Sequence, residues 1–408
     1  MKYIFFTLRD FNKIGGGSIR IHGVVNALSA KGENVILISG AEDYSRFHPD
    51  IKHIKIDAGF RNKAVLQGLT ALLPATAVIT LFPDLFCKIL AGFKQVDLKN
   101  VRIFFFEYLD NSIGYLLKKT GKIDHYITDI HGIAPMEFAH QKRNSPSFLH
   151  RAIAALKYAL AMRHDHKVYQ YADGIIYSSA QMKKYFGNHF RMDRVQSFVL
   201  PNLLADEVFA KTEDIAEIDS LSAELGIRTE DIVLFFAGGY KPTSGVDDLV
   251  KVFAKLRKDF PELKLILIGS GPLKTKVQRL ISEFRLEPWI VQQDGLAYEE
   301  LFRYQALADI IVCPDRMNEF SDMILHLKYM DSLVSGKIVV NGAFSSVLEI
   351  NTDEKLSVNF TPSDEADLFQ ALKNCILHKD ELTEKYKNVR EYIKNHLTYR
   401  SQIDTLIQ

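Results

Sequence analysis

The fold is decided by three stretches near the start of the chain, Tyr3-Ile4-Phe5-Phe6-Thr7-Leu8, Gly15-Gly16-Gly17 and Asn34-Val35-Ile36-Leu37-Ile38. The first and last are apolar runs typical of buried strands. Between them, the pattern from about Ser18 to Ala30 predicts a helix with one apolar stripe. Strand, helix and strand at this spacing form a βαβ unit, whose two strands are parallel.

The same pattern recurs twice along the chain. In the first half, further buried strands are expected at residues 101–106, 125–128 and 174–177. A second series has strands at residues 232–236, 263–268, 290–292, 310–313 and 338–340, with helical segments between them. We therefore predict an α/β protein with two tandem Rossmann-like domains, whose parallel sheets face a cleft between the domains.

The domain boundary is expected at Leu200-Pro201-Asn202-Leu203, where a strand-breaking proline leads into acidic sequence with few aromatic residues. This places an N-terminal domain at residues 1–200 and a C-terminal domain at residues 201–385. The last residues, 386–408, are expected to form a C-terminal helix that can join the N-terminal domain.

The composition is that of a globular protein, with 408 residues, 47% hydrophobic and 25% charged, which excludes disordered and fibrous classes. The three scattered cysteines predict neither a disulfide framework nor a zinc site. The net charge of +1 conceals an asymmetry, because residues 1–200 carry 27 Lys and Arg against 16 Asp and Glu. The basic first half predicts an anionic partner, although attraction between the two halves explains it as well.

No secretory signal is expected, because Arg9 and Asp10 interrupt the first apolar run. Residues 64–83 contain no charge and are long enough to span a bilayer. Polar residues and Pro74 interrupt them, so two short helices joined at Pro74 are the better interpretation. We expect a cytoplasmic protein, with association at the inner face of the membrane as a further expectation.

Glycines mark three predicted strand ends: Gly15-Gly16-Gly17, Gly238-Gly239 and Gly269-Ser270-Gly271. Backbone amides at such ends can approach a phosphate or a sugar. Arg20 stands where a nicotinamide-binding motif has its last glycine, and no P-loop motif follows a strand. A ligand in the predicted cleft is favoured over tight turns alone.

Histidines and basic residues give weaker signals. His164 and His166 flank Asp165 but diverge on a helix, so no metal site is expected. His131 follows a predicted strand end and is as compatible with a structural role as with a functional one. Residues 142–167 form a basic amphipathic helix, interpreted first as a helix covering the sheet and second as a membrane-surface helix.

Several blocks in order resemble glycosyltransferase family 4, a family of retaining GT-B glycosyltransferases. They are Tyr171–Ser179, Val199–Asn202, Gly245–Leu249, Leu265–Pro272, Leu307–Pro314 and Leu327–Lys337. The resemblance covers nearly the whole chain. It implies transfer of a sugar from a nucleotide donor, held mostly by the C-terminal domain, to an acceptor held by the N-terminal domain. A UDP or GDP sugar is the expected substrate, with no cofactor, no metal and no nucleic-acid partner.

The resemblance also implies roles for particular residues. His131 matches the family's first-domain histidine near the transferred sugar, and Asp331 matches the acidic residue that binds the ribose. The donor-binding set it implies is Gly16, Gly17, Gly238, Gly239, Lys241, Gly269, Gly271, Lys328 and Glu349. The basic helix would contact a membrane or a phosphate-bearing acceptor through Arg151, Lys157 and Arg163, as in polysaccharide or glycolipid assembly.

The sequence departs from the family where the diphosphate is handled. Gly239 and Ser244 stand where the family often has an arginine and a lysine, and Met323 occupies the first acidic position, beside Asp322. These departures keep open a catalytically silent relative that binds a glycan or an active partner. An epimerase or a phosphorylase of the same fold is disfavoured, because no pyridoxal site can be argued and an epimerase has little use for the basic helix.

Overall fold

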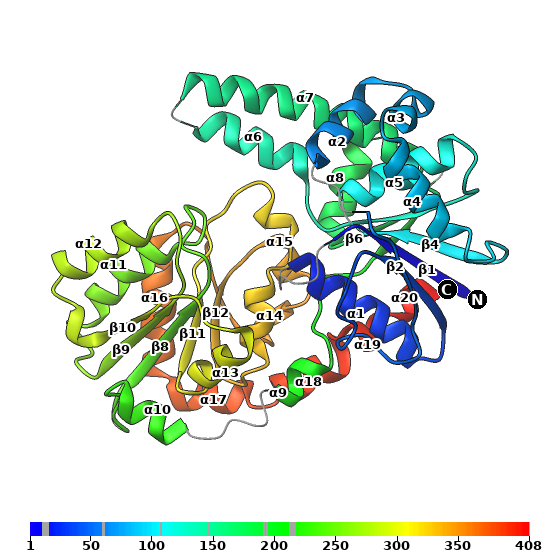
Figure 1. The fold of residues 1–408 in the computed structure, drawn as a ribbon. Coiled ribbons are helices and arrows are strands. Elements are labelled where there is room, and N and C mark those ends of the chain that lie inside the picture. Colours follow the sequence, from blue (N-terminus) through cyan, green and yellow to red (C-terminus); the bar gives the residue numbers. More distant parts are fainter. Residues whose placement is uncertain are drawn as a thin grey trace. The chain divides into compact units, whose positions relative to one another are not determined.

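The computed structural model describes residues 1–9, 16–58, 62–106, 108–145, 147–190, 192, 195–211 and 218–407 (Figure 1). They form two compact units, one of Met1–Ala205 with Tyr399–Gln408 and one of Asp206–Thr398. The chain therefore leaves the first unit after Ala205 and returns to it at Tyr399. Gly15, the first glycine of the triplet, lies outside the described residues.

The first unit contains a parallel sheet of seven strands in the order β3-β2-β1-β4-β5-β6-β7. Its central strand β1 pairs on both sides, so that Ile4 lies opposite Ile36 of β2 and Ile103 of β4. The strands are β1 Lys2–Thr7, β2 Asn34–Ser39, β3 Lys52–Lys55, β4 Val101–Phe105, β5 Ile127–Ile130, β6 Gly174–Tyr177 and β7 Gln196–Val199.

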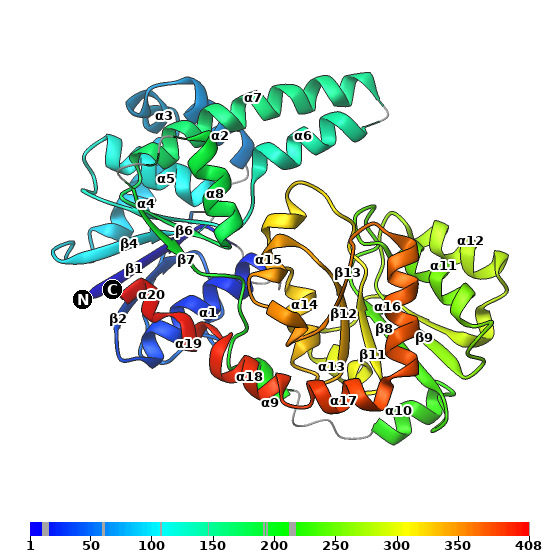
Figure 2. The ribbon, with the colours of Figure 1, turned by 180° about the vertical axis from the view of Figure 1, so that it is seen from behind.

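Ten helices among the described residues belong to this unit. They are α1 Gly16–Ala30, α2 Lys63–Leu72, α3 Ala75–Leu81, α4 Pro83–Phe93, α5 Tyr108–Lys119, α6 Ala134–Asn144, α7 Phe148–Tyr171, α8 Ala180–His189, α19 Tyr399–Gln402 and α20 Asp404–Ile407. Figure 2 shows α19 beside α1. The two helices are so close that a Cβ at Gly23 would lie 2.0 Å from the Tyr399 ring, which explains the glycine at that position.

The uncharged stretch of residues 64–83 forms two short helices, α2 and α3, joined at Pro74, as predicted. Pro74 precedes α3 as its N-cap residue, in an extended conformation. Within the described ranges, no single helix has the length and apolar composition needed to span a bilayer. Helices α3 and α4 have the required length and composition only when taken together, and the chain bends by 103° between them.

The second unit contains a parallel sheet of six strands in the order β10-β9-β8-β11-β12-β13. The strands are β8 Ile232–Ala237, β9 Leu263–Ile268, β10 Ile290–Gln293, β11 Ile310–Cys313, β12 Ile338–Gly342 and β13 Val358–Phe360. The helices are α9 Glu207–Lys211, α10 Ile218–Glu224, α11 Val246–Leu256, α12 Lys274–Glu283, α13 Tyr298–Ala306, α14 Leu327–Leu333, α15 Ser345–Leu348, α16 Glu365–Leu377, α17 Lys379–Tyr386 and α18 Val389–His396.

The prediction of two Rossmann-like domains is confirmed, because both sheets are parallel and alternate with helices. In each sheet the strand that comes first in the chain lies inside, and the strand order reverses beside it, between β1 and β4 and between β8 and β11. Ligands of such sheets bind outside the carboxyl ends of the strands at this reversal. Three short strands, β3, β7 and β13, were not predicted; each lies at the edge of its sheet and mixes polar with apolar residues.

Candidate functional site

In the second unit, three residues follow the two strands at the reversal and the strand next to them: Gly238 after β8, Asp315 two residues after β11, and Gly269 after β9. The two glycine loops lie against each other. A Cβ at Gly269 would lie 2.0 Å from the Gly238 carbonyl oxygen, and a Cβ at Gly271 would lie 2.8 Å from the Tyr240 carbonyl oxygen. Both glycines have positive φ, so the close approach and the backbone conformation each require glycine.

The backbone N–H groups of two predicted donor-binding glycines donate hydrogen bonds within the unit. Gly238 N–H donates to the Ile268 carbonyl at 3.0 Å and Gly269 N–H donates to the Gln293 carbonyl at 2.9 Å. These two amides hold the loops together, and the approach of the glycine loops to a donor phosphate stays a prediction. Gly238 and Gly269 thus shape the loop beside which Lys328 lies.

Lys328 of α14 lies at this loop. Its Nζ would be 3.3 Å from a Cβ at Gly238 and lies 5.2 Å from the centre of the Phe236 ring. It donates to Asp315 Oδ1 at 2.9 Å, and His326 Nδ1 lies 3.5 Å from the other carboxylate oxygen. Burial acts to raise the pKa of Asp315, but Lys328 and His326 more than offset it and hold that pKa below its usual value.

Asp331 is on the same helix, three residues after Lys328, so both side chains project to one side of α14. Its Oδ1 accepts a hydrogen bond from the Tyr298 hydroxyl at 2.7 Å. Burial raises the pKa of Asp331 to about 7. A carboxyl group with this pKa accepts hydrogen bonds best when it is ionised, above neutral pH.

The other predicted positions are more peripheral. Lys241 is exposed and lies in the loop after β8, and Glu349 is exposed just after α15. Ser244, at the position where the family often has a lysine, is buried and donates its hydroxyl to the Lys241 carbonyl at 2.8 Å. Asp322 accepts from the Ser345 amide and hydroxyl at 2.7 and 2.8 Å, which gives it a structural role at the start of α15.

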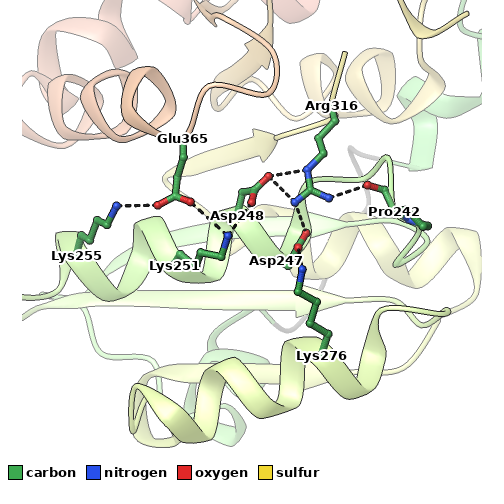
Figure 3. A network of polar contacts seen from close by, with 8 residues as sticks. All are labelled: Pro242, Asp247, Asp248, Lys251, Lys255, Lys276, Arg316 and Glu365. Atoms are coloured by element: carbon green, nitrogen blue, oxygen red, sulfur yellow. Dashed lines mark hydrogen bonds and ion pairs between the residues drawn. The ribbon is translucent and has the colours of Figure 1, made fainter. Parts of the chain in front are cut away.

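A network of ion pairs fastens the loops that carry these groups (Figure 3). Arg316, next to Asp315, contacts Asp247 at 2.9 Å and Asp248 at 2.7 Å, both in the first turn of α11. It also donates to the Pro242 carbonyl at 2.7 Å, in the loop of Lys241. Asp247 is fully buried and contacts Lys276 of α12 at 2.6 Å. Arg316 thus ties the loop after β11 to the loop after β8.

In the first unit, His131 lies just after β5 and borders a buried ion pair. Arg20 Nε donates to Asp129 Oδ2 at 2.8 Å, and both side chains are 1% exposed. His131 Nδ1 lies 3.9 Å from the other oxygen of Asp129. Arg20 Nη1 also donates to the Pro201 carbonyl at 2.9 Å. The arginine that breaks the dinucleotide motif therefore joins α1, β5 and the exit from β7.

Three further side chains at these sites were not predicted. Asp110, at the start of α5 beside the β1–β4 reversal, accepts from the Leu8 amide at 3.0 Å, and burial raises its pKa to about 7. Asp315 and Tyr298 were also missed. Asp315 could have been found, because it follows a predicted central strand just as the glycines do.

Helix α1 begins at Gly16, so Gly16 and Gly17 form its first turn. Gly17 is buried and Gly16 is exposed. The exposed amide end of α1 is where the sequence predicted an approach to a ligand. Among the described residues no cluster of three His, Cys, Asp or Glu side chains is arranged to hold a metal ion.

The basic residues of α7 have different surroundings. Arg151 and Lys157 are exposed, and Lys157 Nζ lies 5.7 Å from the Phe138 ring of α6. Arg163 Nε instead donates to the Ala71 carbonyl of α2 at 2.9 Å. The single helix predicted over residues 142–167 is divided in the structure, because α6 ends at Asn144 and α7 begins at Phe148. Its first interpretation, a helix that covers the sheet, is wrong for the N-terminal half of α7, where Leu149 and Leu156 are exposed.

Two Rossmann-like units in tandem, each with its reversal of strand order, define the GT-B class of fold. Sucrose-phosphate synthase from Thermosynechococcus elongatus has this fold with a TM-score of 0.70 at 15% identity, covering 100% of this chain and 97% of that one. HepE of Anabaena in complex with UDP-glucose matches with a TM-score of 0.70 at 14% identity, over 100% and 99% of the two chains.

The second unit is also recognised by its sequence. Residues 217–396 match the family model described as Glycosyl transferases group 1. Alpha-monoglucosyldiacylglycerol synthase of Acholeplasma laidlawii is 22% identical over 201 residues, which are 48% of this chain and 48% of the relative. The chain thus matches about half or less of the length of its curated relatives.

Proposed function

We propose that this protein is a glycosyltransferase that moves a sugar from a nucleotide-sugar donor, bound by the second unit, to an acceptor bound by the first. The observation that carries the proposal is the family match over residues 217–396. It falls on the unit in which Lys328 and Asp331 project from one side of α14 beside the reversal of strand order. A UDP or GDP sugar is the proposed donor.

The proposed reaction is retaining and needs neither a metal nor a cofactor. The bond from the sugar to the diphosphate breaks, the acceptor oxygen forms the new bond on the same face, and the leaving phosphate takes the acceptor proton. The charge that develops on the diphosphate is stabilised by Lys328, with Lys241 as a second cation. Asp331 accepts hydrogen bonds from the ribose hydroxyls, and His131 positions the transferred sugar.

The proposed acceptor is a glycan or a lipid-linked saccharide used in surface polysaccharide or glycolipid assembly. Two observations support this choice. The first half of the chain is basic, with 27 Lys and Arg against 16 Asp and Glu in residues 1–200, which favours an acceptor that carries phosphate. One relative, similar to about half of the chain, is named as alpha-monoglucosyldiacylglycerol synthase, a name that describes a glycolipid product. We place the protein at the cytoplasmic side of the membrane.

Calorimetric titration with UDP, GDP and CMP sugars and with the free nucleotides tests the donor site. We expect one nucleotide class to bind, with a loss of roughly tenfold or more in Lys328→Met, which removes a charge-assisted contact. Lys258→Met, at an exposed lysine of the same unit, is the matched control and should bind as the wild type does. Affinity should rise as the pH rises through about 7, where Asp331 ionises, and Asp331→Asn should abolish that rise.

A second candidate is a silent relative that binds a glycan or a partner without turnover. It is favoured by one contact, since Asp315 already neutralises Lys328 while Gly239 and Ser244 supply no further cation. Asp315→Asn distinguishes the two candidates. If the wild type binds no nucleotide but this variant does, Lys328 is held away from ligand by its ion pair; if both bind none while folded, the silent relative is supported.

A further inference from the structure

Helix α7 exposes large apolar side chains along its N-terminal half. Phe148 is 81% exposed, Leu149 66%, Leu156 61% and Ile153 42%. Leu149, Ile153 and Leu156 are spaced by four and three residues, so they form one stripe on the helix surface. Phe148 is the first residue of the helix and stands at the end of this stripe.

This stripe is separate from the face that packs inward. Ala154, Ala161 and Val168 are buried, at spacings of seven residues, and they form the side of α7 that packs inside the unit. At about 100° per residue, the exposed stripe points more than a quarter-turn away from that side. An amphipathic helix needs only one buried face, so the outer apolar stripe has no structural purpose within the described part of the unit.

Helices α6 and α7 form an antiparallel hairpin whose connecting end projects away from the rest of the first unit (Figures 1 and 2). Ser147 caps the start of α7 by accepting from the His150 amide. The most exposed apolar residue, Phe148, is therefore at the projecting end. A side chain at such an end can insert into a lipid interface without any displacement of the sheet.

The charges near the projecting end of the hairpin are basic, while the one acidic residue of α6, the exposed Glu137, lies in the first turn of that helix, at its other end. From residue 138 to residue 164 the sequence has five basic residues, Lys142, Arg143, Arg151, Lys157 and Arg163, and no acidic one. Lys142, Arg151 and Lys157 are exposed on the hairpin. Exposed apolar side chains beside a cluster of basic ones are the combination that binds an interface of anionic lipids.

We propose that the end of the α6–α7 hairpin docks on an anionic bilayer, with Phe148, Leu149 and Leu156 inserted at the acyl boundary and Arg151 and Lys157 at the lipid phosphates. A second copy of the chain fits this surface less well, since it would bring the same positive charges face to face. The proposal stands apart from the donor site, because it concerns a surface that contains none of the proposed donor-binding residues.

Sedimentation with vesicles, in the absence of any nucleotide, tests the proposal. We expect the intact protein to bind vesicles of equal parts phosphatidylglycerol and phosphatidylcholine, and to bind pure phosphatidylcholine at least tenfold more weakly. Phe148→Ser with Leu149→Ser should lower the partition coefficient by roughly tenfold or more. Arg151→Gln with Lys157→Gln should lower it by about fivefold for each charge removed.

Matched controls lie in the second unit. Leu377→Ser removes an equally exposed apolar side chain, 60% exposed, and should leave vesicle binding unchanged. Circular dichroism and nucleotide titration of the hairpin variants should match the wild type, which separates a failure of docking from a failure of the donor site. Equal vesicle binding by the wild type and the Phe148/Leu149 variant would overturn the proposal.

A label reports insertion directly. Cys87 is exposed while Cys313 and Cys375 are buried, so Cys87→Ser leaves a background in which Phe148→Cys can be labelled selectively. An environment-sensitive fluorophore at position 148 should shift to the blue on addition of anionic vesicles. No shift, or a concentration-dependent dimer that is lost in Phe148→Ser without any lipid binding, would instead identify this surface as a contact between copies and contradict the proposal.

Discussion

Removing the buried arginine of the first unit tests how the candidate acceptor site is held. Arg20→Met takes the counter-charge from Asp129 at an ion pair of 2.8 Å in which both side chains are 1% exposed. It also leaves the Pro201 carbonyl and the Asn202 side-chain oxygen without the donor they have now. Breaking a buried pair by removing one partner costs about 3–5 kcal/mol, and we expect a loss of that size in the unfolding free energy of this unit.

The chain offers an internal reporter for this experiment. Its single tryptophan, Trp289, lies in the second unit, so tryptophan fluorescence follows that unit while circular dichroism follows both. In Arg20→Met, the first unit's melting midpoint in circular dichroism should fall by roughly 6–20 °C. The fluorescence midpoint should move much less.

A double variant provides the control. Arg20→Met with Asp129→Leu removes both charges and replaces them with apolar side chains, which is expected to restore most of the stability. A loss below about 1 kcal/mol in the single variant, or a double variant no more stable than the single one, would refute the reasoning from the buried pair.

The same pair has a defined pH dependence. Burial acts to raise the pKa of Asp129, but Arg20 and His131 lower it below its ordinary value. Such a carboxyl group stabilises the fold above its unfolded pKa of about 3.9 and loses that contribution as pH falls through the folded pKa. The difference between the wild type and Arg20→Met should therefore be full at neutral pH and shrink below about pH 4.

Three shorter predictions concern the second unit, each measured by urea unfolding followed with tryptophan fluorescence. Burial raises the pKa of Asp331 to about 7, so the contribution of this group to stability is full below its unfolded pKa and is lost as the pH rises through 7. Between pH 5 and pH 8 the unfolding free energy of Asp331→Asn should therefore rise by on the order of 2 kcal/mol relative to that of the wild type. An equal difference at both pH values would count against burial as the cause. Gly269→Ala would place a Cβ 2.0 Å from a carbonyl oxygen at positive φ, and should cost about 2–3 kcal/mol, whereas Gly295→Ala, with nothing within 4 Å, should cost below about 1 kcal/mol. Arg316→Met leaves the buried carboxylate of Asp247 with one cation instead of two and should cost about 1–3 kcal/mol; an unchanged midpoint would show that the network does not fasten the loops.

The architecture was predictable because buried parallel strands have a strong local signal. Runs such as Leu263–Ile268 are apolar on both faces, and a glycine follows them where two loops meet. The edge strand β3, Lys52–Lys55, contains a single apolar residue, Ile54, and therefore has no apolar run or alternation that would indicate a strand. The interior strands of both sheets could therefore be predicted from the sequence, whereas of the four edge strands only β10 was predicted.

The site was only partly predictable, because the sequence does not show which acidic side chain pairs with which basic one. Sequence indicated Lys328, but its ion pair with Asp315 follows from the packing of α14 against the end of β11. Likewise, the sequence shows Arg20 only as a departure from a glycine motif. In the structure Arg20 forms a buried ion pair with Asp129, more than a hundred residues away in the chain. Leu149 and Leu156 lie at the spacing of a buried stripe, and only the projecting hairpin shows that they are exposed.

The two sheets handle charge at their carboxyl ends in the same way. Each has a buried carboxylate that holds a cation, Asp129 with Arg20 and Asp315 with Lys328, and each has a second buried carboxyl group whose pKa burial raises to about 7, Asp110 and Asp331. Groups that are already paired and desolvated need little reorganisation when charge develops nearby. The proposed anionic donor would have to compete with Asp315 for Lys328, so under that proposal the strength of this ion pair limits the donor affinity.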